Sequence, residues 1–232
     1  KLAMVTVSSN PALTATGLEN VNRVVAKDDA QGTAAGALVA DDLGLKKVVV
    51  VDDGTPYGQG LAAEFEKTFT SKGGTVVLKE SVQSKDVDFA ALISRAKQLA
   101  PEAWYFAGAY AQGGLLSKQS KEAGLKVPVI GGDMLYSPEY IKVAGAANAE
   151  GDIATALGLP LDQQPKGVEF ARKYQQKFGK QPEAYDSYAY DAAWIVMNAA
   201  AKAGADRAAV MRAARTGSFD GVTGLVEFDE SG

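Results

Sequence analysis

Four consecutive valines, Val48–Val51, form the clearest hydrophobic pattern in the chain, and they stop at Asp52-Asp53-Gly54. A continuous β-branched run of this kind is typical of a parallel strand that is buried on both faces. Two further apolar runs, 103–107 and 127–130, also end in turns that contain glycine. We therefore expect three neighbouring strands of one parallel sheet.

Three side chains with binding chemistry follow these strands, namely Tyr57, Tyr110 and Asp133. Open α/β sheets bind ligands at the carboxyl ends of their strands, so the three residues are expected along one edge of the sheet. A loop tyrosine offers both an apolar ring and a hydroxyl to a small ligand. Asp133 suits a ligand ammonium, although it could instead cap a helix near Pro138.

Helical patterns alternate with the strands between residues 27 and 157. Leu61, Phe65 and Phe69 recur every four residues and mark one helical face. In a second helix, over Gln31–Asp42, the expected inward residues are Ala34, Ala35, Leu38 and Val39. Alternation of this kind produces right-handed βαβ crossovers, so the fold class is α/β with a parallel sheet. The remaining expected strands are 75–81 and 151–157, and the remaining helices are 89–99, 113–123 and 138–144.

The alternation of strands and helices stops after residue 157. Three helical patterns, at 165–178, 187–203 and 206–216, follow with no strand between them. A helix must bury its apolar face on another element, and only Leu2–Val7 and Gly224–Phe228 read as strands there. We therefore expect residues 1–26 and 158–232 to form part of a second lobe that is incomplete in this chain.

The composition excludes several classes of protein. The 232 residues carry a net charge of −4 and include no run of lysine and arginine, so nucleic acid is an unlikely partner on charge grounds. There is no cysteine and no histidine, which removes disulfides, thiolate and imidazole metal sites, and Ser-His-Asp chemistry. No apolar stretch approaches the ~18 residues that cross a bilayer. Neither an enzyme nor a metal or other cofactor is expected.

Other polar and aromatic groups have two interpretations. Asp52 and Asp53 favour a turn and a helix cap over acid–base chemistry, and Gly58-Gln59-Gly60 lacks the Gly-Lys-Ser/Thr of a phosphate loop. Ser8, Ser9 and Asn10 form either a plain turn or a set of donors for a carboxylate. A last aromatic group consists of Tyr185, Tyr188, Tyr190 and Trp194. It mostly indicates core packing, because Tyr190 and Trp194 are four residues apart, although the turn 185–187 could reach a cleft.

These segments together resemble type I periplasmic solute-binding proteins of the branched-chain amino-acid class, the receptors of ABC importers. No single motif decides the resemblance, but the segments occur in the family's order along nearly the whole chain. They are Ser8–Thr14, Gln31-Gly32, Val48–Ala62, Asp88–Lys97, Tyr105–Leu125, Val129–Asp133, Phe178–Ala193 and Gly221–Gly232.

The resemblance implies two α/β lobes joined by a hinge, with residues 27–157 as the C-terminal lobe and the rest as a remnant of the N-terminal lobe. It assigns the ligand carboxylate to Ser8 and Ser9, the walls of the interlobe cleft to Tyr57 and Tyr110, and the ligand ammonium to Asp133. Because the two lobes hold opposite ends of a zwitterion, the ligand would favour a closed state. The family has longer chains, so this one is expected to be a fragment that binds ligand weakly by itself.

The resemblance further implies a periplasmic monomer that delivers a small amino acid to a membrane permease. Two alternatives remain open at this stage. The same fold serves sensory and regulatory domains, and related binders take aromatic acids or amides in place of amino acids.

Overall fold

The computed structural model describes residues 2–83 and 85–232, which form two compact units. Unit 1 combines the residues up to Lys27 with Leu157–Gly232, and unit 2 is the continuous segment Asp28–Ala156. These bounds differ by one residue from the division expected on the sequence. Each unit has its own hydrophobic core and is described separately.

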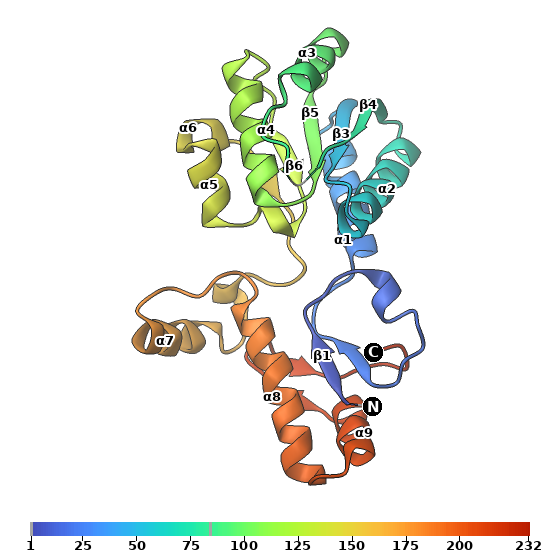
Figure 1. Ribbon diagram of the computed structural model, residues 1–232, viewed down its shortest axis with the longest axis vertical. Helices are drawn as coiled ribbons and strands as arrows, with labels where there is room; N and C mark the ends of the chain where they lie inside the picture. The colour runs from blue at the N-terminus through green and yellow to red at the C-terminus, as the bar shows by residue number, and fades with distance from the viewer. Residues whose placement is uncertain (1, 84) are drawn as a thin grey trace. The chain divides into compact units, whose positions relative to one another are not determined.

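Unit 2 is built on a five-stranded sheet with the order β4-β3-β5-β6-β7 (Figure 1). Every neighbouring pair is parallel, which confirms the predicted fold class. The valine run lies in β3, next to the centre of the sheet, and Val48–Val51 are fully buried. The strands are β3 (Lys47–Asp52), β4 (Thr75–Ser81), β5 (Ala103–Ala107), β6 (Val129–Gly131) and β7 (Ile153–Ala154).

Helices cover both faces of this sheet. One face is covered by α1 and α2, and the other by α3, α4 and α5. A short turn of π-helix, Leu38–Asp42, continues α1, and a 3-10 helix, η3, follows β6. The bounds are α1 (Asp28–Ala37), α2 (Pro56–Ser71), α3 (Ala90–Leu99), α4 (Tyr110–Glu122), η3 (Asp133–Leu135), α5 (Pro138–Ala144) and α6 (Ala146–Ala149).

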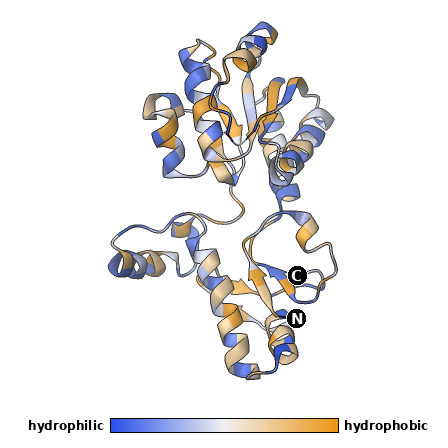
Figure 2. Cartoon of the chain, viewed as in Figure 1, coloured by the Kyte–Doolittle hydropathy of each residue, from blue (hydrophilic) through white to orange (hydrophobic). Residues whose placement is uncertain are grey.

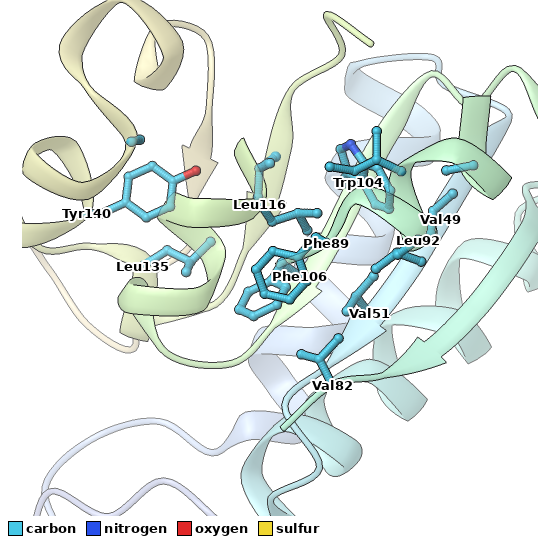
Figure 3. Packing of buried hydrophobic residues seen from close by; sticks show 14 residues of the cluster. Val49, Val51, Val82, Phe89, Leu92, Trp104, Phe106, Leu116, Leu135 and Tyr140 are labelled. Carbon is cyan, nitrogen blue, oxygen red and sulfur yellow. The ribbon is translucent and has the colours of Figure 1, made fainter. Parts of the chain in front are cut away.

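The alternation of side chains along the strands gives unit 2 one core on each face. On the first face, Phe65 of α2 stacks on Tyr105 of β5, with ring centroids 3.6 Å apart. The predicted helical face of Leu61, Phe65 and Phe69 is confirmed, since all three side chains are buried. On the second face, Trp104 and Phe106 meet the side chains of α3 and α4 (Figure 3). The prediction that Ala34 points inward is wrong, because it is exposed and α1 begins three residues earlier than expected.

A buried carboxylate, Asp152, organises the second face of unit 2. It pairs with Lys121 at 2.7 Å and accepts hydrogen bonds from the hydroxyls of Ser117 and Tyr140. The oxygen that pairs with Lys121, Oδ1, also accepts from the backbone N–H of Val129, the first residue of β6. Burial and the neighbouring carboxylate raise the pKa of Tyr140 above its ordinary value, so its hydroxyl stays a donor. The network anchors the start of the strand that leads to Asp133.

Unit 1 contains two small two-stranded sheets. Strands β1 (Met4–Thr6) and β2 (Val21–Arg23) are parallel, whereas β8 (Phe219–Asp220) and β9 (Leu225–Val226) are antiparallel. The prediction of only two strands in this part of the chain is wrong. β2 and β8 were missed because their residues, Val-Asn-Arg and Phe-Asp, form no apolar run, unlike the segments that hold β1 and β9. The helices are η1 (Pro11–Leu13), η4 (Leu161–Gln163), α7 (Gly167–Phe178), α8 (Asp186–Ala203) and α9 (Arg207–Thr216).

The core of unit 1 lies where α8 and α9 meet the strands. Its centre consists of Ile195, Ala199, Ala214 and Phe219. α8 is predominantly hydrophobic along its length, whereas α7 is predominantly hydrophilic (Figure 2). The predicted core packing of the aromatic residues of α8 is confirmed for Tyr188, which is 7% exposed, and wrong for Tyr190, which is 51% exposed. With Trp194 and Phe170, Tyr190 lines an open groove of about 530 Å³ between α7 and α8.

Within the described residues, no helix is long and apolar enough to cross a membrane.

Candidate functional site

The turn after β3 is held by its own aspartates. Asp52 accepts hydrogen bonds from Gly54 N–H at 2.9 Å and from the Ser81 hydroxyl at 2.7 Å. Asp53 accepts from both the N–H and the hydroxyl of Thr55. These contacts agree with the structural role that was expected for the two aspartates. The helix cap itself is Thr55, whose hydroxyl accepts from Gly58 N–H, and not an aspartate.

This turn places Tyr57 in the first turn of α2, where its hydroxyl donates to Asp133 Oδ1 at 2.9 Å. Asp133 lies two residues after the end of β6, as the first residue of η3, and is 8% exposed. The alternative of a cap for α5 is wrong, since Ser137 caps that helix. Two strand-end residues that are 76 positions apart in sequence therefore meet at the carboxyl edge of the sheet.

Burial raises the pKa of Tyr57 far above its ordinary value, and the charge of Asp133 and the hydrogen bond to it add to the shift. The Tyr57 hydroxyl consequently remains protonated and donates to the carboxylate throughout the physiological range. A neutral donor stabilises the negative charge of Asp133 without cancelling it.

Gln31 in α1 is a member of this site that sequence reasoning did not single out. Its amide is placed with Nε2 toward Asp133, because the reverse orientation sets two oxygens against each other. Nε2 then donates to Asp133 Oδ1 at 2.9 Å, and Oε1 accepts from the N–H of Asp133 at 3.1 Å. The hydroxyl oxygen of Thr155, the residue directly after β7, lies 3.2 Å from the same Oε1. The only signal in the sequence was the Gln31-Gly32 pair within the family resemblance.

A second carboxylate, Asp28, acts on the same edge of unit 2. Asp28 is the first residue of α1 and is 2% exposed. Burial raises the pKa of Tyr105, and the charges of Asp133 and then Asp28 raise it further. The Asp133 carboxylate, which accepts hydrogen bonds from neutral donors, makes this edge favourable for a cation or an ammonium.

Tyr110 is the first residue of α4 and is 37% exposed. The helix begins three residues earlier than predicted, so Tyr110 belongs to its first turn instead of a loop. None of the hydrogen bonds that join described side chains connects Tyr110 with Tyr57 or Asp133. Its role as a wall of the site stays a prediction.

Ser8 and Ser9 lie in unit 1, in the loop between β1 and η1. Ser8 is exposed, and its N–H donates to the Thr6 hydroxyl at 3.0 Å. The plain-turn interpretation fits Asn10, whose side chain caps η1 by accepting from Ala12 N–H. The assignment of Ser8 and Ser9 to a carboxylate stays a prediction.

Arg23 of β2 fixes this loop and was also missed on the sequence. It is 8% exposed and donates to the carbonyl of Ser8 at 2.7 Å, to the carbonyl of Asn10 at 3.0 Å and to the hydroxyl of Thr14. Because the guanidinium takes up carbonyl oxygens, the loop is held in one conformation next to a positive charge. No sequence pattern pointed to Arg23, since β2 itself was not predicted.

The described residues contain no group of three or more acidic side chains that is arranged to hold a metal ion.

Comparison with known proteins decides the family. A family model described as "Periplasmic binding protein" matches residues 3–232. The chain belongs to the periplasmic binding protein family. The proteins in this family are binding proteins and not enzymes, in agreement with the sequence-based expectation.

Relatives within the periplasmic binding protein family match almost the whole of this chain. A Leu/Ile/Val-binding protein homologue from Brucella melitensis is 37% identical over 227 residues, which is 97% of this chain and 60% of that protein. A leucine-, isoleucine-, valine-, threonine- and alanine-binding protein from Pseudomonas aeruginosa is 33% identical over 99% of this chain and 61% of its own length.

Solved structures of periplasmic binding proteins share the fold. The crystal structure of a leucine-binding protein from Thermotoga maritima superposes with a TM-score of 0.89 at 33% identity, covering 99% of this chain and 66% of that one. A branched-chain amino-acid binding protein from Streptococcus pneumoniae in complex with isoleucine also gives 0.89, at 26% identity and with the same coverage. The chain thus spans somewhat less than two thirds of the length of these relatives.

Proposed function

We propose that this protein is the solute-binding receptor of an ABC importer and binds a small amino acid of the branched-chain type. The observation that supports this most directly is the Asp133 carboxylate, which lies at the carboxyl edge of the unit 2 sheet and accepts from neutral donors. The names of two relatives, a Leu/Ile/Val-binding protein homologue and a leucine-, isoleucine-, valine-, threonine- and alanine-binding protein, agree with this choice of ligand.

In this proposal Asp133 receives the α-ammonium of the ligand. In a partly desolvated site, an ion pair stabilises the complex only when the carboxylate is already hydrogen-bonded and charged. Tyr57 meets that condition, because it donates a hydrogen bond but carries no positive charge that would compete with the ligand. A hydrogen bond to a charged group contributes about 1.5–3 kcal/mol.

The other end of the ligand, the carboxylate, is assigned to the hydroxyl and N–H groups of Ser8 and Ser9. Arg23 supports the assignment, because it holds the carbonyls of Ser8 and Asn10 and adds a positive charge beside the loop. Tyr57 and Tyr110 would contact the aliphatic part of the ligand with their rings. We further propose a periplasmic location, a monomeric state and a membrane permease as the partner.

Calorimetry with leucine and two truncated analogues tests the proposal. 4-Methylpentanoate lacks only the ammonium, and 3-methylbutylamine lacks only the carboxylate. Leucine should bind at least tenfold more tightly than either analogue, since each analogue forfeits about 1.4 kcal/mol or more of charged hydrogen bonding. Asp133→Asn should weaken leucine by about 10- to 100-fold and leave 4-methylpentanoate nearly unaffected. The control Glu122→Gln, at the exposed far end of α4, removes one negative charge away from the site.

Two results would contradict the proposal. One is equal affinity for leucine and 4-methylpentanoate, which would mean that no group recognises the ammonium. The other is tight binding of benzoate in place of any amino acid, which would favour the aromatic-acid alternative.

A further inference from the structure

We propose that Gln31 is a positioning residue, which holds the Asp133 carboxylate in the orientation that receives the ligand ammonium. This inference rests on the proposed function, because it concerns the same carboxylate. It adds a residue that does not itself touch the ligand.

The contacts between the two residues fix both the side chain and the backbone of Asp133. Gln31 Nε2 donates to Oδ1 at 2.9 Å, while Oε1 accepts from the N–H of Asp133 at 3.1 Å. One amide thus closes a ring of two hydrogen bonds on a single residue. Rotation of the carboxylate or of the peptide before it would break at least one of them, so the pair restricts Asp133 at two points.

Tyr57 completes the arrangement from another helix. Its hydroxyl donates to the same Oδ1 at 2.9 Å, so two neutral donors from α1 and α2 converge on one oxygen. Thr155 adds a contact from the segment after β7, since its hydroxyl lies 3.2 Å from Gln31 Oε1 and 3.1 Å from the carbonyl of Gly131. The orientation of Asp133 is therefore set by three separate segments of unit 2, namely α1, α2 and the segment after β7.

The chemistry of glutamine fits this role better than that of other long polar residues. A lysine or arginine at position 31 would pair with Asp133 and compete with the ammonium of the ligand. A glutamate would repel the carboxylate. An amide donates and accepts at once and leaves the charge of Asp133 in place for the ligand.

The residue after Gln31 explains how the amide reaches Asp133. A Cβ atom at Gly32 would lie 2.8 Å from Glu64 Cβ and 3.0 Å from the carbonyl oxygen of Leu61, both in α2. Only glycine allows α1 and α2 to approach so closely at this point. The close approach places Gln31, 4% exposed, at the edge of the sheet where β6 ends. The Gln31-Gly32 pair thus has a single physical explanation.

The test compares the affinity for leucine with that for 4-methylpentanoate in the variant Gln31→Met, which keeps the length of the side chain but not the hydrogen bonds. We expect leucine to bind about tenfold more weakly and 4-methylpentanoate to change less than about twofold. The ratio of the two affinities should fall accordingly. Gln98→Met, the same change at an exposed position of α3, should leave both affinities unchanged.

A second variant, Gln31→Glu, supplies a pH profile. At pH 8 the two carboxylates repel and displace each other. At pH 5 the pair can share a proton, so that the glutamate again donates to Asp133. Leucine affinity of this variant should rise as the pH falls, whereas the affinity of the wild-type protein should stay level. A flat profile for Gln31→Glu would overturn the proposal.

The outcomes separate this inference from the proposed function. If the wild-type protein does not prefer leucine to 4-methylpentanoate, or Asp133→Asn has no effect, the proposed function itself is wrong. If both hold and Gln31→Met leaves the ratio unchanged, or weakens the two ligands equally, only the role of Gln31 is wrong. Should Gln31→Met fail to fold, Gln31→Asn gives the same readout, because it keeps the amide but is too short to reach both atoms of Asp133.

Discussion

The substitution Gly132→Ala tests the geometry around Asp133 with a single methyl group. Gly132 has φ −79° and ψ −176°, an extended conformation that alanine adopts without strain. The obstacle is space, because a Cβ at this position would lie 2.4 Å from the hydroxyl of Tyr57 and 2.5 Å from Leu61 Cδ2. Any effect of the change therefore reports on packing and not on backbone freedom.

The magnitude follows from these two distances. The Tyr57 hydroxyl must move by about 1 Å to reach an ordinary contact, which lengthens its 2.9 Å hydrogen bond to Asp133. Overpacking of this kind costs about 1–3 kcal/mol. We expect the free energy of unfolding of unit 2 to fall by about 2–3 kcal/mol, and leucine affinity to fall about tenfold through the displaced Tyr57.

The assay can separate the two units by fluorescence, since the chain has two tryptophans. Trp104 is fully buried in unit 2, and Trp194 belongs to unit 1. In a Trp194→Phe background, urea unfolding followed at Trp104 reports on unit 2 alone.

Two comparisons make the result decisive. Gly60→Ala, at an exposed position of α2 with no atom within 4 Å of the added Cβ, should stabilise unit 2 by about 0.5–1 kcal/mol. In the double variant Gly132→Ala/Tyr57→Phe the hydroxyl is gone. The double variant should therefore lose less stability than the sum of the losses in the two single variants. Full additivity, or a Gly132→Ala protein as stable as wild type, would refute the contact between Gly132 and Tyr57.

Four other predictions concern the scaffold. A protein made of residues 28–156 alone should unfold cooperatively in thermal melts, because it contains the complete five-stranded sheet and both its cores; a non-cooperative melt would contradict this. Tyr105→Phe should stabilise unit 2 by about 1–2 kcal/mol at pH 7, because the hydroxyl is buried without a hydrogen-bond partner among the described residues; destabilisation in urea would be the opposite result. The pKa of Tyr105 is raised above 10 in the folded state, so its proton is lost first from the unfolded chain. The stability that Tyr105 contributes is therefore fully present below pH 10 and then falls by about 1.4 kcal/mol per pH unit; Tyr57 and Tyr140 add to the overall slope, which Tyr105→Phe should make shallower. Arg23→Met should destabilise unit 1 by about 3 kcal/mol and speed hydrogen exchange in the loop after β1, whereas Arg212→Met, at an exposed position, should change stability by less than about 0.5 kcal/mol.

Periodicity in the sequence was sufficient for the main elements of unit 2. The run Val48–Val51 predicted a buried parallel strand, and the four-residue spacing of Leu61, Phe65 and Phe69 predicted the buried face of α2. These patterns survive folding because each strand or helix must bury its own apolar side chains whatever its neighbours are. The same reasoning failed for β2 and β8, whose short sequences contain polar residues and form no apolar run.

At the candidate site, the sequence identified Tyr57 and Asp133 as strand-end residues, because the carboxyl ends of parallel strands share one edge. It did not indicate that the two side chains bond to each other, since residues 76 positions apart meet only through the strand order of the sheet. The roles of Gln31 and Arg23 could not be predicted from the sequence for the same reason. A glutamine in a helix or an arginine in a short strand has no distinctive pattern, and its partners lie on other elements.

By itself, then, the sequence determined the main strands and helices of unit 2, the parallel α/β class and the family resemblance, all of which depend on local periodicity or on ordered motifs. Only the tertiary structure decided that Gln31, Tyr57 and Asp133 form one hydrogen-bonded group and that Gly132 leaves room for it. Such contacts depend on ångström-scale distances between separate elements. Those distances are set by the packing of whole helices on the sheet, which no short stretch of sequence encodes.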